Sequence, residues 1–321
     1  MYVSELEYHN GLPSVPSPLE STESFQTRAT TTSISIIIFI TDINAHATPL
    51  HATTQAPAFA MDYETPDGSQ FSLQEVFSDG DDNNSPSFQY TSITALVNGE
   101  AFAGKSDQRM EDVDEIDILD LLRPVPLENI NPLVPDDFTR APPALTHDSH
   151  FLKAPSFMYE DSEPGRTFVA ACLLNEATVL EKLRNHSHPN IVQYYGCVVQ
   201  GGRITQLCLK RYESSLADHV TRPLSRQQRR RIFEDVVSAV KHLHTLGLAH
   251  NDICPHNICI DSDGRPAIVD FDSCLPFGEP LLKGVAADAY GGRHVSAAEN
   301  DFLALDEFKD FLEALDDDAY T

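Results

Sequence analysis

The stretch of this chain that most restricts its fold begins near Leu224, where a capped helix, a polar loop and a tight hairpin follow one another. Ser225 and Gln228 can form a capping box at the start of the helix, and Gly247 can end it. Its apolar residues recur at helical spacing and comprise Ile232, Val236, Val240 and Leu243. This pattern predicts a long amphipathic helix that delivers the chain directly into the polar loop.

The hairpin after the loop is predicted from Asp263-Gly264, which lies between two apolar runs. With these two residues as the turn, Asn257 faces Asp270. Directly opposed side chains lie about 5 Å apart, so an amide and a carboxylate are expected side by side. Asp252 lies five residues before Asn257 and can reach the same place. Such oxygens suit Mg²⁺, and a further carboxylate can orient a hydroxyl, as phosphoryl transfer requires.

The sequence "HNDICPHNICID" followed by "VDFDS" resembles the catalytic loop H-R-D-x-x-x-x-N and the D-F-G motif of protein kinases. "HPNIVQYYG" resembles the segment before the fourth small-lobe strand, and "SAAENDFLALDEFKDFLEAL" the close of the activation segment. That last stretch runs into the helix whose buried Asp, here Asp301, braces the catalytic loop. The resemblance covers about residues 150–321 and is closest to a divergent group of short fungal kinase-like proteins.

This resemblance implies an α+β, two-lobed, protein-kinase-like domain with a truncated C-terminal lobe. It implies ATP and Mg²⁺ as cofactors and a protein hydroxyl, of Ser or Thr, as the acceptor. Asp252 takes the role of catalytic carboxylate, and Asn257 and Asp270 that of metal ligands.

Glu176 is the one acidic residue in the apolar stripe of a second predicted helix, "TFVAACLLNEATVLEKLRNH". An unpaired carboxylate there is costly, so a partner is expected. Lys153, in the strand-like "HFLKAPSF", is assigned as that partner, and the resemblance implies that the pair holds the ATP phosphates. The plain alternatives are that Glu176 lies at the rim of the stripe and that Lys153 is an exposed strand residue. Gly201-Gly202 is expected to join two antiparallel strands.

Several residues depart from the kinase pattern. "TRAPPALTHDSHFLK" has no glycine, so no Gly-rich loop precedes Lys153. Asn251 stands where the family has Arg, Cys254 where Lys is common, and Asp272 where the motif has Gly. Residues 270–298 contain no Thr and two Ser, so control by loop phosphorylation is not expected. These departures leave two alternatives open: a pseudokinase that binds nucleotide or acts as a scaffold, and a small-molecule kinase with a related loop.

The charge is unevenly distributed: residues 1–150 carry −19 of the net charge of −27, and residues 151–321 carry −8. A chain this acidic is repelled by nucleic acid. Residues 1–87, rich in Ser, Thr, Pro and acid, are predicted to be disordered. Residues 88–149 are predicted to hold a hairpin at Asn98-Gly99, a short helix ending at Pro124, and a Pro-rich linker.

Six Cys lie in the second half, without a C-x-x-C pair, which favours a reducing intracellular setting, cytoplasmic or nuclear. A zinc site at His250, Cys254, His256 and Cys259 is an alternative, but its spacing fits no familiar finger. "SISIIIFI" at residues 33–40 is too short to span a bilayer, so no membrane is expected. Arg229-Arg230-Arg231 is interpreted as a solvated helix face; docking of the acidic N-terminal segment is the alternative.

Overall fold

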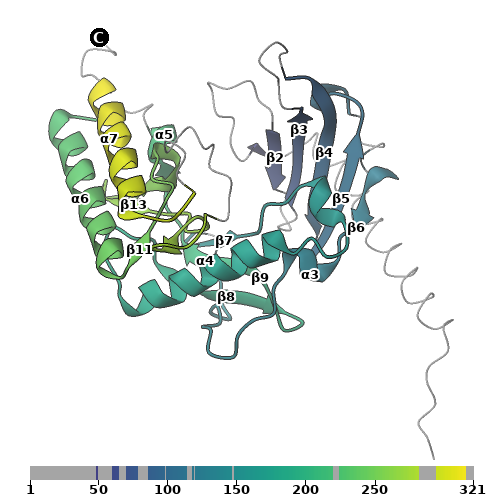
Figure 1. Cartoon of the computed structure of the whole chain (residues 1–321), viewed down its shortest axis with the longest axis horizontal. Helices are drawn as coiled ribbons and strands as arrows, with labels where there is room; N and C mark the ends of the chain where they lie inside the picture. Colours follow the sequence, from purple (N-terminus) through teal and green to yellow (C-terminus); the bar gives the residue numbers. More distant parts are fainter. Residues whose placement is uncertain are drawn as a thin grey trace, which may run out of the picture.

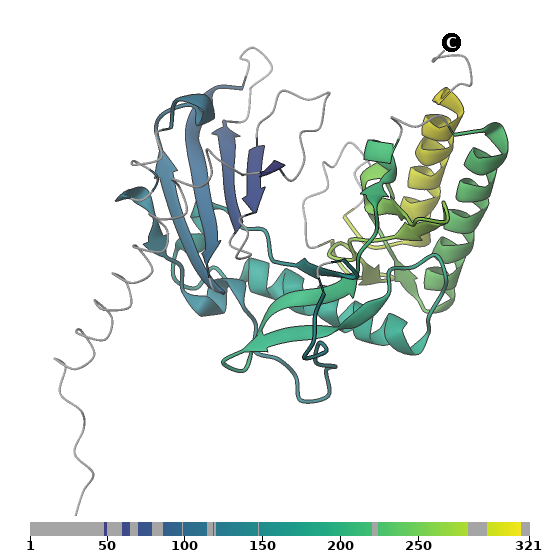
Figure 2. The same cartoon turned by 180° about the vertical axis from the view of Figure 1, so that it is seen from behind.

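The computed structural model describes residues 48–49, 60–64, 70–78, 86–97, 99–113, 118, 120–146, 148–219, 224–281 and 294–315. In these ranges, a six-stranded N-terminal sheet stands beside a second part built from a three-stranded sheet and long helices (Figures 1 and 2). Helix α4 (Phe168–Asn185) reaches from the N-terminal sheet at one end to helix α6 (Arg226–Thr245) at the other. The described residues therefore form an α+β structure in which one helix contacts both parts.

The N-terminal sheet is antiparallel with its strands in chain order. They are β1 (Thr48–Pro49), β2 (Ala60–Glu64), β3 (Gln70–Phe77), β4 (Phe88–Val97), β5 (Glu100–Ser106) and β6 (Arg123–Pro124). Val97 pairs with Glu100, which confirms the hairpin predicted at Asn98-Gly99. Phe71 and Leu73 are only 4% and 6% exposed, so β3 has a packed core, contrary to the disorder predicted for residues 1–87. Its partner strand β4 lies beyond that region, so the region's composition did not reveal the pairing.

The two faces of this sheet pack against different parts of the chain. One face forms a core of Phe71, Leu73, Ile93, Ala95, Val97, Phe102, Met110 and Leu122. The other face brings Ala101 and Ala103 against Val125, Ile130, Phe157 and Val169. Because Val169 belongs to the first turn of α4, the sheet is packed onto the second part rather than tethered to it.

The Pro-rich stretch predicted as a linker is folded and packed. Helix α3 (Leu127–Ile130) begins it, and Asn129 and Asn131 are buried. Asn129 Nδ2 donates to the carbonyls of Asp161 and Glu163, both at 2.7 Å. Thr139 N donates to Glu181 Oε1 at 2.7 Å, which ties the stretch to α4. Specific side-chain hydrogen bonds, which composition does not reveal, hold this segment in place.

The smaller sheet and α4 follow the sequence prediction closely. Strand β7 (His150–Lys153) pairs with β9 (Arg203–Lys210), which pairs with β8 (Tyr194–Gln200). Gly201 and Gly202 make the turn with φ of 56° and 78°, values that glycine adopts without strain. All five predicted stripe positions of α4 are buried: Val169, Leu173, Glu176, Leu180 and Leu183.

Helix α6 has the predicted capping box at Ser225 and Gln228, and its predicted apolar stripe is buried. The remaining elements are η1 (Met110–Asp112), η2 (Tyr159–Ser162), β10 (Ser214–Ser215), α5 (Leu216–His219), β11 (Leu248–Ala249), η3 (Pro255–Asn257), β12 (Ile258–Ile260), β13 (Pro266–Ile268), β14 (Leu275–Pro276) and α7 (Ala298–Ala314). One core cluster joins α4, α6, α7 and the small strands, so the polar loop is held from several sides.

The hairpin after the loop forms, but in a different register from the one predicted. Ile260 pairs with Pro266 and Ile258 with Ile268. Asp261 N donates to Arg265 O at 3.0 Å, so the turn has three residues, with Gly264 at φ 73°. Asn257 O therefore accepts from Val269 N, and Asn257 does not directly face Asp270. The prediction was wrong by one residue, because Asp-Gly also fits a three-residue turn.

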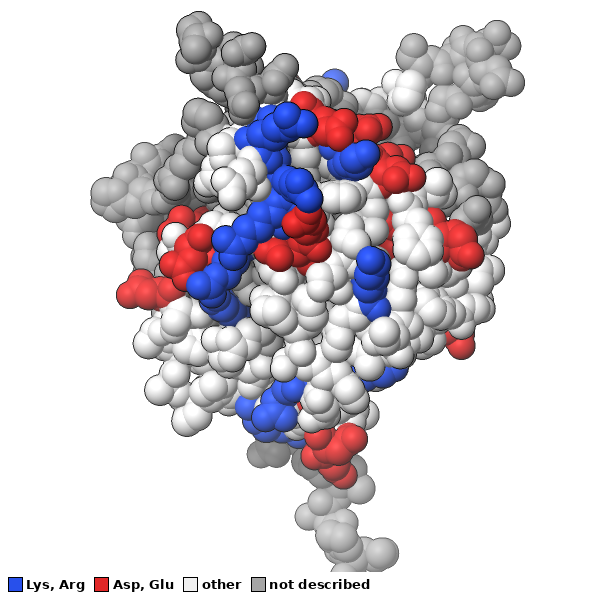
Figure 3. Space-filling view, turned by 90° about the vertical axis from the view of Figure 1, so that its left-hand side faces the viewer, with Lys and Arg blue, Asp and Glu red and all other residues white. Residues whose placement is uncertain are grey.

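Figure 3 shows the side of the molecule on which α6 lies in Figure 1, and basic side chains gather there beside acidic ones. Arg230 pairs with Glu234 at 2.8 Å, and its side chain is 80% exposed. Arg231 Nε lies 3.9 Å from Asp235 Oδ2. Arg229 instead donates to the carbonyls of Leu224 and Leu315. The solvated-face interpretation fits Arg230 and Arg231, while Arg229 ties α6 to the end of α7.

Two sequence features lie outside the described residues. These are the apolar run at residues 33–40 and most of the short helix predicted before Pro124, at residues 114–117 and 119. Among the helices that the structure describes, none has the length and apolar character needed to cross a membrane.

An ion pair at the edge of the N-terminal core generates a pH prediction. Arg109 Nε and Nη2 donate to the two oxygens of Glu75 at 2.6 and 2.7 Å, and Met110 N donates to Glu75 Oε1 at 3.0 Å. The hydrogen bonds from Arg109, assisted by Met110, hold the pKa of Glu75 below its ordinary value of 4.5 despite burial. A depressed carboxyl pKa stabilises the fold above the unfolded value, and this stabilisation is lost as the pH falls through the folded value.

We therefore expect the stability of the native chain to fall below about pH 4.5, and Glu75→Gln to flatten this part of the profile. Urea unfolding at pH 7, 5 and 3, monitored by far-UV circular dichroism, measures this dependence of stability on pH. Glu100→Gln, an exposed change on β5, is the matched control. A Glu75→Gln profile that overlays the native one would contradict the assignment.

Candidate functional site

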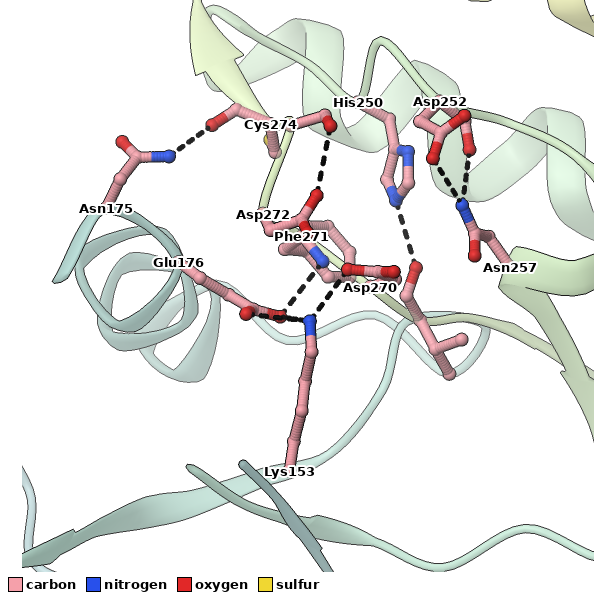
Figure 4. Close-up of polar contacts among 12 residues, drawn as sticks. Lys153, Asn175, Glu176, His250, Asp252, Asn257, Asp270, Phe271, Asp272 and Cys274 are labelled. Atoms are coloured by element: carbon pink, nitrogen blue, oxygen red, sulfur yellow. Dashed lines mark hydrogen bonds and ion pairs between the residues drawn. The ribbon is translucent and has the colours of Figure 1, made fainter. Parts of the chain in front are cut away.

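The centre of the site is a buried ion pair between Lys153 at the end of β7 and Glu176 in the middle of α4. Lys153 Nζ lies 2.7 and 2.8 Å from the two oxygens of Glu176 (Figure 4). The Glu176 side chain is 3% exposed. The contact predicted from the lone carboxylate in the α4 stripe is therefore present, and both plain alternatives are wrong.

Asp270 joins this pair, which the sequence did not predict. Lys153 Nζ donates to Asp270 Oδ1 at 2.7 Å, so its ammonium group contacts two carboxylates. Asp270 has φ of 61°, in the left-handed region that residues other than glycine seldom adopt. Phe271 N then donates to Glu176 Oε1 at 3.2 Å. The left-handed backbone at Asp270 is thus held by the bond from Lys153 to its own side chain and by the bond from the next residue, Phe271, to Glu176.

Asp252 and Asn257 form the second half of the site (Figure 4). The one-turn helix η3 brings Asn257 back so that its Nδ2 donates to Asp252 O at 2.9 Å and to Asp252 Oδ2 at 2.8 Å. Since the amide nitrogen is used in this way, Oδ1 is the Asn257 atom suited to a cation. Val269 N donates to Asn257 O at 2.9 Å, which brings the next residue, Asp270, close to Asn257, and Figure 4 draws Asp270 between this pair and Lys153.

His250 and Asp301 support the loop from behind. His250 is fully buried, with Nε2 3.1 Å from Val269 O and its ring against Phe271. Asp301, also fully buried, accepts from Asn251 N at 2.8 Å and His250 N at 3.0 Å. The structure thus places Asp301 as the expected brace and gives His250 a packing role.

The charge of the site favours a cation. The ammonium group of Lys153 contacts the carboxylates of Glu176 and Asp270, and the charge of Asp272 also acts on it. Burial acts to lower the pKa of Lys153, but the charges of Glu176, Asp270 and Asp272 outweigh it and raise the pKa, so the lysine stays protonated. The remaining negative charge near Asp270 suits a divalent cation.

The donor set fits Mg²⁺ bound together with substrate phosphates. Asn257 and Asp270 offer two protein oxygens, and Mg²⁺ usually takes one or two carboxylates plus phosphate and water oxygens. Among the described residues, no cluster of three or more His, Cys, Asp or Glu is arranged to hold a metal by itself. The zinc alternative at His250, Cys254, His256 and Cys259 is therefore not supported.

Comparison with known proteins assigns the fold. Residues 160–286 match the protein kinase domain family. The serine/threonine-protein kinase/endoribonuclease IRE1 of Hypocrea jecorina is 32% identical over 99 residues, 27% of this chain and 8% of that protein. The 3-phosphoinositide-dependent protein kinase 1 of Arabidopsis thaliana is 36% identical over 119 residues, 35% of this chain and 23% of that protein.

These matches place residues 160–286 in the protein kinase superfamily. The α+β kinase-like fold expected from the loop motifs is thereby confirmed. A solved yeast structure, the RNA Pol II CTD kinase CTDK-1 complex, aligns with a TM-score of 0.38 and 18% identity over 46% of this chain and 51% of that chain. The chain spans less than a quarter of the length of the two curated kinases above.

The kinase match begins at residue 160, so Lys153 lies upstream of it and is linked to the site by tertiary contact alone. Sequence reasoning also missed Asn175, whose Nδ2 donates to Cys274 O at 3.0 Å and holds the segment after Asp270 against α4. No local signal marks Asn175, because adjacent helix residues point to different faces and its partner lies 99 residues away in the sequence.

Asn251, which replaces the kinase Arg, is the centre of a buried polar network. Its Nδ2 donates to Ser273 O and Ser296 Oγ, each at 3.0 Å, and its Oδ1 accepts from Asn300 Nδ2 at 3.0 Å. Ser296 Oγ in turn donates to Leu275 O at 3.0 Å. Both ends of the segment after Asp270 are thus attached to the catalytic loop by neutral hydrogen bonds. Asn also tolerates the φ of 62° at this position.

Replacing Asn251 should cost stability through lost hydrogen bonds and, in one variant, through backbone strain. Asn251→Gly keeps the backbone conformation but leaves buried partners unpaired, so we expect a loss of about 2–4 kcal/mol. Asn251→Ala should lose about 1 kcal/mol more, because alanine is strained at positive φ. Urea unfolding measures both, with Ser262→Ala in the exposed turn as a control. If the free energy of unfolding of Asn251→Gly lies within about 0.5 kcal/mol of the native value, the network does not stabilise the fold.

Proposed function

We propose that this chain is an ATP- and Mg²⁺-dependent protein kinase that transfers the γ-phosphoryl group of ATP to a Ser or Thr hydroxyl of a protein. The observation that carries the proposal is the meeting of Lys153, Glu176, Asp252, Asn257 and Asp270 in one site (Figure 4). These five residues come from four segments of the chain, since Asp252 and Asn257 share one loop, and each has the chemical character that phosphoryl transfer demands.

The roles follow from the contacts. Lys153, held by Glu176, contacts the phosphates, and Asn257 Oδ1 and Asp270 hold the metal. A Mg²⁺ ion held there would supply positive charge against that of the phosphates. Asp252 orients the acceptor hydroxyl and receives its proton, while Asn257 Nδ2 fixes the carboxylate at 2.8 Å. Catalysis here consists of positioning and charge stabilisation, because little covalent chemistry falls to the protein.

Nucleotide binding without catalysis is the second candidate, and one observation favours it. An ammonium group has three N–H donors, and Lys153 Nζ makes three hydrogen bonds, two to Glu176 and one to Asp270. A phosphate must therefore displace one of these bonds, and Asp270 is the one expected to move toward the metal. If Asp270 stays with Lys153, the domain is a pseudokinase.

The partners proposed are ATP and a protein substrate, and the place proposed is the reducing interior of the cell. None of the six Cys, all of which lie in the described residues, forms a disulfide. Burial raises the pKa of the Cys254 thiol beside the catalytic loop, so this thiol is a weak nucleophile. Cys254 therefore acts by packing, and phosphoryl transfer does not use it.

Asp252→Asn tests catalysis separately from binding. We expect it to abolish phosphoryl transfer to a generic substrate such as myelin basic protein, while ATP binding and the unfolding midpoint stay at native values, because the amide keeps the shape but not the basicity. The readout is incorporation of labelled γ-phosphate, with Asp263→Asn in the exposed turn as the control. Equal activity in Asp252→Asn would refute the assignment, and no activity in the native chain would favour the pseudokinase.

A thermal-shift titration with ATP tests the metal site. At 1 mM ATP and a Kd near 0.1 mM, binding stabilises the fold by about 1.4 kcal/mol. We expect this shift to require Mg²⁺ and to disappear in Asp270→Ala. Asp261→Ala, a carboxylate of the neighbouring hairpin, is the control and should keep the Mg²⁺ dependence. A shift of equal size with and without Mg²⁺ would argue against the metal role of Asp270.

A further inference from the structure

A cavity of about 530 Å³ lies at the end of α4, apart from the site described above. Its lining comes from the last turns of α4, from the loop of residues 187–193 with the start of β8, and from the end of β9. None of the five residues of the proposed active site lines it. Small-molecule sites have volumes of roughly 300–1,000 Å³, so this cavity is a separate place of adequate size for a ligand.

The inner part of the cavity is apolar and belongs to the core. Leu180 and Leu183 come from α4, and Ile191 and Val192 come from the loop that follows it. These four side chains are between 1% and 6% exposed and are members of the large core cluster. A ligand that reaches them gains by burying apolar surface of its own, so its body is expected to be apolar.

The loop that forms one wall is fixed by backbone hydrogen bonds to two strands. Val192 N donates to Ile268 O of β13 at 2.9 Å. Lys210 N, at the end of β9, donates to Gln193 O at 2.8 Å. Because both sides of the loop are attached to strands, the cavity is formed before a ligand arrives, which lowers the entropic cost of binding.

The charged part of the lining is basic. Arg184, in the last turn of α4, and Lys210 both line the cavity, and none of its lining residues is acidic. Among the described residues, no carboxylate forms an ion pair with Arg184. Lys210 Nζ lies 3.8 Å from Asp261 Oδ2, too far for a hydrogen bond. In a chain with a net charge of −27, such a lining favours an anionic ligand.

Tyrosine rings stand beside these two cations. Tyr195 belongs to β8 and Tyr212 follows β9, and both rings line the cavity and are half-buried. The Tyr195 ring packs against His150, with 5.0 Å between centroids, so its position is fixed. Rigid, partly exposed rings offer faces for a flat apolar group. The lining therefore suits an aromatic group that carries an anionic substituent.

We propose that this cavity binds a small aromatic anion, a ring that carries a phosphate ester or a carboxylate. Arg184 and Lys210 contact the anionic group, and the ring extends toward the apolar inner part. The inference goes beyond the proposed phosphoryl transfer and does not depend on it, because the cavity shares no lining residue with that site.

The test titrates the full chain with 1-naphthyl phosphate, observed by ligand NMR. Its two parts, 1-naphthol and inorganic phosphate, are titrated separately, and 1-naphthoate distinguishes a carboxylate from a phosphate ester. We expect the native chain to bind at least one of the two aromatic anions about tenfold more tightly than either part, because charge-assisted hydrogen bonds add to apolar burial.

Arg184→Gln and Lys210→Gln should each weaken the aromatic anion about fivefold and leave 1-naphthol unchanged. Arg226→Gln and Lys241→Gln are the matched controls, since they remove the same charge from exposed positions of α6 outside the cavity. We expect both controls to bind as the native chain does. Equal weakening in the controls would show a general charge effect and overturn the assignment. Arg184 is exposed, so Arg184→Gln is the variant to rely on if Lys210→Gln does not fold.

ATP with Mg²⁺ separates the cavity from the proposed active site. We expect the aromatic anion to stay bound when ATP and Mg²⁺ are added, whereas displacement would place it in the active site and overturn the assignment. Modification by phenylglyoxal, mapped by mass spectrometry, is an independent readout: the ligand should protect Arg184 and not Arg226. Failure of the native chain to bind either aromatic anion, or equal modification of Arg184 with and without ligand, overturns the inference and leaves the kinase proposal standing.

Discussion

The rest of the site depends on the ammonium group of Lys153. It joins β7, α4 and the segment after β13, which are far apart in the chain, through Glu176 and Asp270. Glu176 is nearly inaccessible, and a buried carboxylate without a cation would be strongly destabilising. Because Phe271 N also donates to Glu176, and the Phe271 ring packs on His250, the same ion pair sets the path of the chain toward the catalytic loop.

A second layer of hydrogen bonds holds that loop, and most of its members are neutral. Asp301 is a buried carboxylate of this layer; it accepts from two backbone amides and lies 2.8 Å from His244 Nε2. Asn251 connects the loop to Ser273, Ser296 and Asn300. In a kinase with Arg at this position, the corresponding link can involve a phosphate. Asn251 makes its link with uncharged groups inside the core, so the position of the segment ends does not depend on an added charge.

The N-terminal sheet is an additional structural element beside the part of the chain that carries Lys153. Its face is shared between packing on α4, through Ala101 and Ala103, and a cavity that Lys153 also lines. The stretch after β6, anchored by Asn129 and by Thr139, is part of the same structure. The sheet that packs on α4 thus comes from a region with few kinase features in its sequence.

The sequence by itself determined the features that depend on short-range rules. The capping box at Ser225, the Gly201-Gly202 turn and the helical stripe around Glu176 are local, and a lone buried carboxylate demands a cation wherever it lies. The tertiary structure alone decided the hairpin register, the bond from Lys153 to Asp270, the network at Asn251 and the folding of β3. Each of these depends on a partner distant in sequence or on a turn length that Asp-Gly leaves open. Only the packed chain can select among such partners, because their energies arise from burial rather than from the local order of residues.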